Sequence, residues 1–297
     1  RVLFSSLVSK LITKIKEREK EIIFETDDLV YDPKYLKHMD YLKQMNRFEK
    51  MLYENGVGGE ILNDPYVKIC TTTTSYLAEK LKEKNKRVFI IPNKLSNSDL
   101  EICEKINNAK NSKLEIRNSI RLGYFSGTIS HNKDFAAITE VLLQIMEKYP
   151  QVELFLVGPL DIDNKLNKFK DRIKQLPYVP RRKHFENIAQ VDINLAPLEI
   201  GNPFCESKSE LKFFEAGILE VPTIASATRT FREAIEDGVD GFVASTTEEW
   251  IEKLEKLIEN KDLRVKMGEK AKEKVLEKYT TKNSKNEEYY NYLKSKL

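Results

Sequence analysis

A strand, a helix and a second strand are predicted in turn by residues 191–226, VDINLAPLEIGNPFCESKSELKFFEAGILEVPTIAS. Residues 192–196 and 222–226 are predicted strands, and residues 208–218 carry apolar side chains at helical spacing. Two strands joined by one helix favour a right-handed parallel crossover. The stretch therefore predicts an α/β fold with doubly wound parallel sheets.

The same alternation continues in both directions along the chain. Further strands are predicted at residues 21–24, 67–70, 87–91, 119–125, 153–157, 176–179 and 241–243. Further helices are predicted at residues 4–19, 34–54, 75–84, 133–148, 163–174, 183–189, 229–236, 246–259, 261–278 and 283–296. The polar stretch 93–118 separates two such series, so it is interpreted as a domain boundary. We expect domains at 1–112 and 113–280, with a terminal helix in 281–297 that packs back toward the first domain.

Composition excludes several classes of protein. Lys and Arg total 50 against 47 Asp and Glu, a net charge of +3, whereas a dedicated nucleic-acid binder needs a clustered basic footprint. Hydrophobic residues make up 40%, which excludes a disordered chain. The three cysteines form neither a zinc pattern nor a disulfide framework, and no apolar run approaches the ~20 residues of a membrane span. A cytoplasmic protein is expected. Because the chain opens with Arg, residue 1 is expected to lie inside a longer protein.

The first candidate site is the loop that follows the strand at 119–125, within GYFSGTISHNKDF (123–135). Ligands of such sheets bind at the carboxyl ends of the strands. Gly127 allows a ligand to approach the backbone closely, and the start of the next helix offers free N–H groups to an anion. His131 is placed to donate to a phosphate or sugar oxygen. The alternative is a plain turn capped by Asn132 or Asp134, with His131 on the surface.

The second candidate site is the predicted helix at 208–218. Glu215 follows Lys208 by seven residues, almost two turns, so both side chains would share one face about 10 Å apart along the axis. That spacing suits a nucleoside diphosphate, with the cation on the phosphates and the carboxylate on the ribose hydroxyls. The alternative is an amphipathic helix whose charges form ion pairs in solvent.

Several blocks of the sequence resemble a known family. The blocks are GYFSGTISHNKDF (123–135), LFLVGP (154–159), YVPRRKHFENIAQVDINLAPLE (178–199), KSELKFFEAGILEVPTIAS (208–226) and FREAIEDGVDGFVA (231–244). From about residue 119 to 280 the chain is similar to the carboxyl-terminal domain of GT-B-fold, family-4 retaining glycosyltransferases. Residues 21–32, 70–81 and 88–96 more weakly resemble the last three strand units of that family's acceptor-side domain. The resemblance implies two Rossmann-like domains, the amino-terminal one incomplete.

The resemblance also implies roles for individual residues. Glu215 matches the ribose-binding Glu of the family. Residues that would contact the diphosphate and donor sugar are Lys208 and Ser209, and the phosphate-side loop is Ser126, Gly127 and Thr128. Backbone groups of Tyr178, Val179 and Pro180 would hold the base.

One position departs from the family pattern. The family usually has two Glu residues separated by seven others, but the residue eight before Glu215 is Ser207. Glu206 is nine before, half a turn out of phase on a helix, so it could take the missing role only from the preceding loop. Ser207 and Glu206 are therefore both retained as candidates for donor binding.

Several other acidic and basic residues have both a functional and a structural interpretation. Asp27 and Asp28 end the strand at 21–24 and would orient or deprotonate an acceptor hydroxyl, bind a divalent ion, or simply cap a helix. Arg181, Arg182 and Lys183 are interpreted as donor-phosphate attraction or as surface. His184 and His38 are expected to have no partner.

The implied activity is sugar transfer from a nucleotide sugar to a carbohydrate, lipid-linked or protein acceptor, in bacterial surface-glycan or glycoconjugate synthesis. Lys208, the amides near Ser126–Thr128 and the helix dipole would stabilise the leaving diphosphate, with no cofactor or metal. Lipid-linked acceptors would bring the protein to the inner face of a membrane. The alternatives are a GT-B epimerase or phosphorylase, and a non-catalytic nucleotide-sugar-binding or scaffold module.

Overall fold

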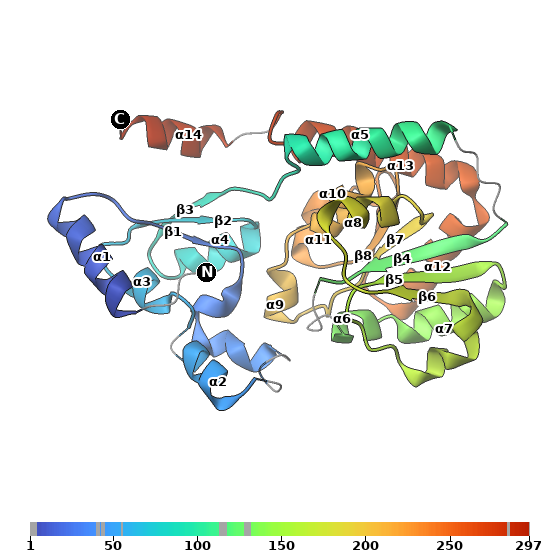
Figure 1. Ribbon diagram of the computed structural model, residues 1–297, viewed down its shortest axis with the longest axis horizontal. Helices are drawn as coiled ribbons and strands as arrows, with labels where there is room; N and C mark the ends of the chain where they lie inside the picture. Colours follow the sequence, from blue (N-terminus) through green and yellow to red (C-terminus); the bar gives the residue numbers. More distant parts are fainter. Residues whose placement is uncertain are drawn as a thin grey trace. The chain divides into compact units, whose positions relative to one another are not determined.

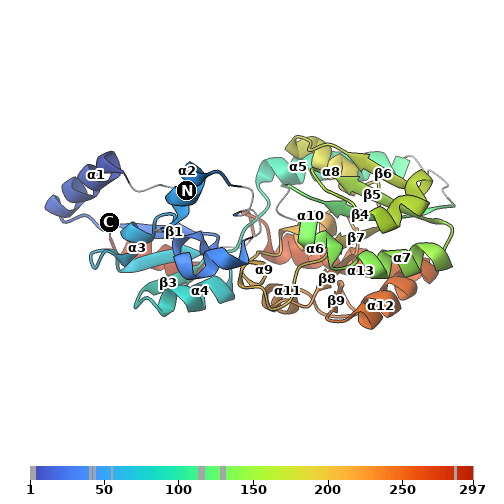
Figure 2. The ribbon, with the colours of Figure 1, turned by 90° about the horizontal axis from the view of Figure 1, so that it is seen from below.

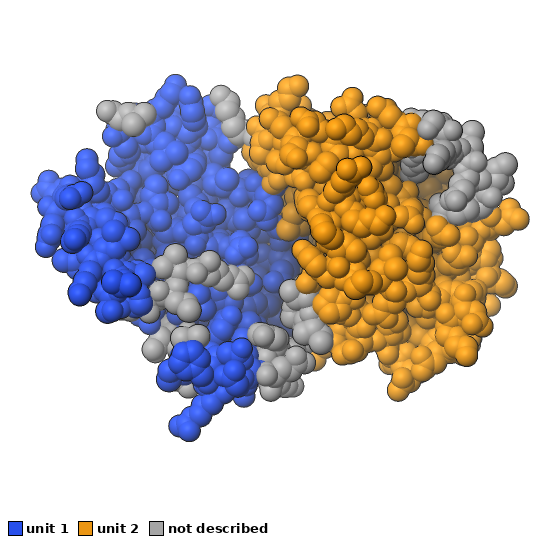
Figure 3. All heavy atoms as spheres, in the orientation of Figure 1, with its two compact units in different colours: residues 1–93, 201–209, 285–297 blue, residues 94–200, 210–284 orange. Residues whose placement is uncertain are grey.

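The chain divides into two compact units, coloured separately in Figure 3. Unit 1 comprises residues 1–93, 201–209 and 285–297, and unit 2 comprises residues 94–200 and 210–284. The computed structural model describes residues 5–39, 42, 45–54, 56–112, 118–127, 132–283 and 286–296. Among these residues, no helix is both long and apolar enough to cross a membrane.

Unit 2 contains a six-stranded parallel sheet in the order β6-β5-β4-β7-β8-β9. Its strands are β4 (Ile120–Phe125), β5 (Val152–Val157), β6 (Ile173–Leu176), β7 (Ile193–Ala196), β8 (Thr223–Ser226) and β9 (Phe242–Ala244). The chain runs outward from β4 to β6, returns to β7 on the other side of β4, and then runs outward again to β9. The strand order therefore reverses between β4 and β7.

Helices cover both faces of this sheet (Figure 1). They are α5 (Asn97–Ser112), α6 (Asn132–Ala136), α7 (Thr139–Lys148), the 3-10 segment η5 (Asn164–Arg172), α8 (Arg181–Ile188), α10 (Leu211–Gly217), α11 (Arg229–Ala234), α12 (Thr247–Glu259) and α13 (Lys261–Lys278). Helices α7 and α12 lie side by side (Figure 2) and bury their apolar residues with those of the strands in one core. Helices α5, α8, α10 and α13 contact one another in series.

Unit 1 contains a three-stranded parallel sheet in the order β1-β2-β3. Its elements are α1 (Ser6–Glu17), β1 (Ile23–Thr26), the 3-10 segments η1 (Leu29–Tyr31) and η2 (Pro33–His38), α2 (Arg47–Glu54), α3 (Gly59–Asn63), β2 (Ile69–Thr72), α4 (Ser75–Lys82), β3 (Arg87–Ile90), α9 (Pro203–Glu206) and α14 (Glu287–Lys294). Phe204 from α9 is buried in the core of this unit, which explains why residues 201–209 belong to it. In α14, the rings of Tyr289 and Tyr292 each lie 5.1 Å from that of Phe89.

The predicted strands are confirmed within about three residues, whereas several helix predictions were wrong, among them the following two. The stretch 93–118 was predicted without a regular element, yet it contains α5. Ser96 and Asp99 cap this helix reciprocally, each accepting the backbone N–H of the other, and Cys103 is its one fully buried side chain among those described. The predicted helix at 34–54 is interrupted, and α2 starts afresh because Asn46 and Glu49 form another reciprocal cap.

Gly158 allows the ends of β4 and β5 to approach closely. Its φ is +105°, in the region that favours glycine, and a Cβ at this position would lie 1.9 Å from the carbonyl oxygen of Ser126. Gly158 also donates its N–H to the Leu176 carbonyl oxygen at 2.9 Å, while the Ser126 N–H donates to Val157 at 2.8 Å. This junction therefore fixes the backbone at Ser126, directly after β4.

We predict that Gly158→Ala destabilises the protein by at least about 3 kcal/mol, because backbone strain and a backbone collision add. Gly238→Ala is the matched control, since Gly238 also has a positive φ (+84°) but its nearest atom would be 3.8 Å away. The control should lose only about 1 kcal/mol. Urea unfolding measures the free energy of unfolding of both variants. If both lose the same amount, the predicted collision of a side chain at position 158 with the backbone does not occur.

Candidate functional site

The carboxyl ends of β4 and β7 lie where the strand order of unit 2 reverses. In open α/β sheets, ligands bind in the crevice at this kind of switch point. The Phe125 ring, at the end of β4, meets the His184 ring of α8 edge-on, with 5.6 Å between ring centroids. Helix α8 in turn contacts α10. The first turns of α8 and α10 thus converge on the end of β4.

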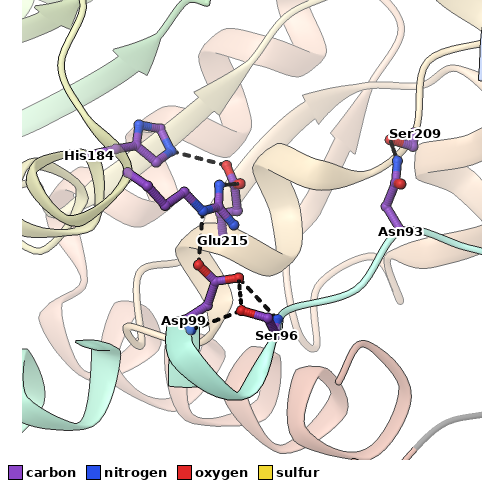
Figure 4. A network of polar contacts seen from close by, with 7 residues as sticks. Asn93, Ser96, Asp99, His184, Ser209 and Glu215 are labelled. Atoms are coloured by element: carbon purple, nitrogen blue, oxygen red, sulfur yellow. Dashed lines mark hydrogen bonds and ion pairs between the residues drawn. The ribbon is translucent and has the colours of Figure 1, made fainter. Parts of the chain in front are cut away.

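Glu215 of α10 is the central acidic group of this region (Figure 4). Its residue exposure is 8%, and its Oε2 lies 3.0 Å from His184 Nε2. Its Oε1 accepts a hydrogen bond from Arg181 Nη1. Burial alone would raise the pKa of Glu215, but the hydrogen bond and charge of His184 and of Arg181 outweigh it and lower that pKa. The carboxylate therefore stays ionised although it is buried.

Lys212 is a second charged group of the same helix. Its Nζ donates to the carbonyl oxygen of Phe125 and lies 4.8 Å from the centroid of the Tyr124 ring. Burial lowers the pKa of Lys212 to about 8, partly opposed by the negative charges of Glu215 and Asp134. The ammonium group of Lys212 is thereby held at the end of β4, beside the carbonyl group of the residue that precedes Ser126.

The loop after β4 is described only as far as Gly127. Ser126 is buried, whereas Gly127 is exposed and a Cβ added there would meet no atom within 4 Å. The backbone at Gly127 is therefore open to a ligand. Thr128 and His131, both predicted to bind the donor, lie outside the described residues.

The prediction that Lys208 and Glu215 share one helix was wrong. Residues 208–218 do not form a single helix, because α9 ends at Glu206 and α10 begins only at Leu211. The hydroxyl of Ser207 donates to the Phe204 carbonyl oxygen at 2.8 Å, which closes α9 locally. Lys208 then lies between the two helices and belongs to unit 1, whereas Glu215 belongs to unit 2.

The side chains around Lys208 are engaged within unit 1. Lys208 Nζ lies 3.4 Å from Asp28 Oδ2, and Asp28 Oδ1 also accepts the Leu29 N–H at 2.7 Å, capping η1. Glu206 accepts the Gly201 N–H at 3.1 Å. Ser209 accepts a hydrogen bond of 3.0 Å from Asn93 (Figure 4). The described contacts of Asp28 thus combine the predicted cap with an ion pair to Lys208.

The remaining predicted residues lie at the ends of elements. Asp27 follows β1 directly. Tyr178 is 69% exposed, Val179 is half-buried, and Pro180 is the residue that precedes α8. The segment 178–180 therefore leads into the turn that carries Arg181 and His184.

Sequence reasoning missed two residues of this region and misjudged two others. His184 was expected to have no partner, but it contacts Glu215. Arg181 was interpreted as phosphate attraction or surface, and Asp99 and Lys212 were not singled out. The spacing of Arg181 with His184, and of Lys212 with Glu215, places each pair on one helix face and could have marked them. That the pair on α8 lies next to the pair on α10 is evident only from the tertiary structure.

Comparison with known proteins identifies the family. A sequence model described as "Glycosyl transferases group 1" matches residues 107–274, more than half of the chain. The chain belongs to the group 1 glycosyl transferases. A comparison with curated protein sequences found no match. The group 1 assignment confirms the family predicted from the sequence, a nucleotide-sugar glycosyltransferase.

Solved structures of this family's fold are similar along nearly the whole chain. The structure of Anabaena HepE in complex with UDP and glucose is 15% identical, with a TM-score of 0.68, over 97% of this chain and 75% of that one. WaaG, a glycosyltransferase involved in lipopolysaccharide biosynthesis, is 17% identical, with a TM-score of 0.61, over 91% and 78%. Sucrose-phosphate synthase from Thermosynechococcus elongatus is 14% identical, with a TM-score of 0.64, over 96% and 72%. The predicted GT-B fold, with two parallel sheets, is confirmed.

The lowered pKa of Lys212 predicts a pH-dependent stability. Between about pH 8 and pH 10.4 the unfolded chain holds this proton and the folded protein does not, so stability rises with pH. We expect the free energy of unfolding of the parent, relative to Lys212→Met, to rise by about 1 kcal/mol per pH unit in this window. Urea unfolding at several pH values measures it, with Lys183→Met as the exposed control. If the difference in unfolding free energy between the parent and Lys212→Met does not change with pH, the pKa of Lys212 is not lowered in the folded protein.

Proposed function

We propose that this group 1 glycosyltransferase binds its donor on unit 2, with Glu215 accepting hydrogen bonds from both ribose hydroxyls of a nucleoside diphosphate sugar. The ionised, mostly buried carboxylate of Glu215 at the switch point carries this proposal. An ionised carboxylate only accepts hydrogen bonds, and it offers about four lone-pair sites, so it suits a pair of neighbouring hydroxyl donors. HepE, the similar structure, was solved with UDP-glucose, which makes a uridine donor the first to test.

The phosphates would lie against the backbone of Ser126 and Gly127. Gly127 leaves this backbone uncovered, and Lys212 supplies a positive charge at the preceding carbonyl group. When the bond between the anomeric carbon and the diphosphate oxygen breaks, negative charge grows on the diphosphate. Fixed amides and a fixed ammonium stabilise that charge without a metal ion. We propose that Thr128 and His131 also bind the donor, as the sequence predicts.

The other predicted residues keep their assignments as parts of this proposal. Tyr178, Val179 and Pro180 would hold the base, since they lead directly into the turn of Arg181. Glu206, Ser207 and Ser209 stay predicted donor-binding residues; they belong to unit 1, and the site proposed on unit 2 does not depend on them. Asp27, Asp28 and Lys208 are assigned to the transfer step, supported by the ion pair that places a carboxylate beside an ammonium in unit 1.

We further propose retention of the anomeric configuration and an acceptor hydroxyl from a bacterial surface glycan or glycoconjugate. The transition state resembles an oxocarbenium ion, so the donor carbon needs a negative partner on the face where the acceptor oxygen enters. WaaG, which acts in lipopolysaccharide biosynthesis, supports this acceptor class. The acceptor would be carbohydrate, lipid-linked or protein, and unit 1 would bind it.

Glu215→Gln tests the donor site. We expect nucleoside diphosphate binding to weaken by about 1–3 kcal/mol, because a neutral amide replaces a charged acceptor of two hydrogen bonds. Isothermal titration calorimetry with UDP, GDP and ADP measures the loss, and Glu186→Gln is the matched control, since Glu186 pairs with Arg182 and Lys183 of its own helix. Donor hydrolysis measured in EDTA tests metal independence on the same samples. Unchanged affinity for every nucleotide would exclude this site.

Gly127→Ala tests the phosphate position. The space around Gly127 is open, so the variant should keep the parent's thermal stability. A methyl group on that backbone should nevertheless weaken nucleoside diphosphate binding about tenfold, while binding of the nucleoside alone is unchanged. Thermal unfolding and calorimetry measure the two effects. Full diphosphate affinity in a stable variant would place the phosphates elsewhere.

A further inference from the structure

We propose that Arg181, anchored by Asp99, is a positioning residue that orients Glu215 for the ribose and thereby makes the donor site select ribonucleotides over 2′-deoxyribonucleotides. This inference rests on the proposed role of Glu215. Arg181 itself is assigned no contact with the donor. Its part is to fix the direction in which the free lone pairs of Glu215 point.

The hydrogen bonds of Glu215 leave room for two more donors. Arg181 and His184 occupy one site on each carboxylate oxygen. A carboxylate has about four acceptor sites, so about two remain, the number that two ribose hydroxyls need. Because both oxygens of Glu215 are already hydrogen-bonded to residues of α8, the carboxylate cannot rotate, and the direction of its remaining lone pairs is fixed.

Three contacts hold the Arg181 guanidinium. Its Nε donates to Asp99 Oδ1 at 3.0 Å, its Nη1 donates to Glu215, and its Cζ lies 4.5 Å from the centroid of the Phe185 ring. The planar guanidinium donates in fixed directions, so two hydrogen bonds and a stacked ring define its orientation. A lysine would keep the charge but would lack these directions.

Asp99 is a fixed anchor for Arg181. Its Oδ2 accepts the Ser96 N–H at 3.0 Å and the Ser96 hydroxyl at 2.9 Å, at the start of α5 (Figure 4). Burial favours the neutral acid, but the hydrogen bonds from Arg181 and Ser96 outweigh it and lower the pKa of Asp99. The first turn of α5 thus presents an ionised carboxylate to Arg181.

The bonds of this chain join three separate elements. Asp99 lies on α5, Arg181 and His184 on α8, and Glu215 on α10. If Arg181 only stabilised the fold, its loss would affect all ligands of the site equally. If it positions Glu215, its loss affects the ligands that use the ribose hydroxyls more than those that lack one.

The experiment compares ribonucleotides with their 2′-deoxy analogues by calorimetry, using UDP, GDP and ADP and the three matching deoxy compounds. We expect the parent to bind its best ribonucleotide at least about tenfold more tightly than the analogue. Arg181→Lys and Asp99→Asn should each reduce this ratio of affinities by about threefold or more, mainly because the ribonucleotide binds more weakly. Arg182→Lys is the control, because Arg182 is 77% exposed in its side chain and bonds only to Glu186 among the described contacts; its ratio should equal the parent's.

The outcomes separate this inference from the proposed function. If Glu215→Gln removes the preference for ribose while Arg181→Lys and Asp99→Asn retain it, the positioning role is overturned and the donor site stands. Equal weakening of both compounds by Arg181→Lys also overturns the positioning role. If the parent binds none of the nucleotides, or if Glu215→Gln leaves binding and preference unchanged, the donor site itself is excluded. Asp99→Asn decides the question alone should Arg181→Lys fail to fold, since it keeps the acceptor for the Ser96 cap.

Discussion

The charge of Glu215 is the constraint around which unit 2 is arranged. A carboxylate this deeply buried is tolerated only if cations and hydrogen-bond donors compensate it, and Arg181 and His184 do so. Arg181 is itself compensated on its other side by Asp99. Ion pairs and hydrogen bonds therefore connect α10 to α8 and α8 to α5. The three helices are held together by these charges as well as by apolar packing.

The position of this network follows from the topology of the sheet. Because the strand order reverses between β4 and β7, the connections after these two strands diverge at the carboxyl end of β4. His184 and Lys212 both contact Phe125 there, one through its ring and one through the carbonyl oxygen. Gly158, at the end of the neighbouring strand, accommodates the Ser126 carbonyl. The positions of Glu215, of Lys212 and of the open backbone at Gly127 therefore all follow from the strand order of this sheet.

Unit 1 shows how one buried aromatic residue can redirect a motif. Phe204 packs into the core of unit 1 with Leu29 and Leu77, so the chain leaves unit 2 after residue 200 and rejoins it at residue 210. Lys208 falls within this excursion and pairs with Asp28, while Glu215 lies beyond it. A stretch that reads as one helix therefore supplies residues to both units. The family assignment does not depend on that helix, since it rests on residues 107–274 as a whole.

The sequence by itself determined the strands, their parallel connection and the group 1 family, because apolar periodicity and ordered motifs are local properties of the chain. It did not determine the break between α9 and α10, the helix in 97–112, or the partners of Glu215. Periodicity cannot reveal a short buried face such as that of α5, nor the Ser207 hydrogen bond that ends α9. Glu215 contacts His184 and Arg181, which precede it by 31 and 34 residues, and Arg181 contacts Asp99 across 82 residues of chain. Contacts at that separation depend on how helices pack against the sheet, so only the tertiary structure decided which charges compensate the buried acid.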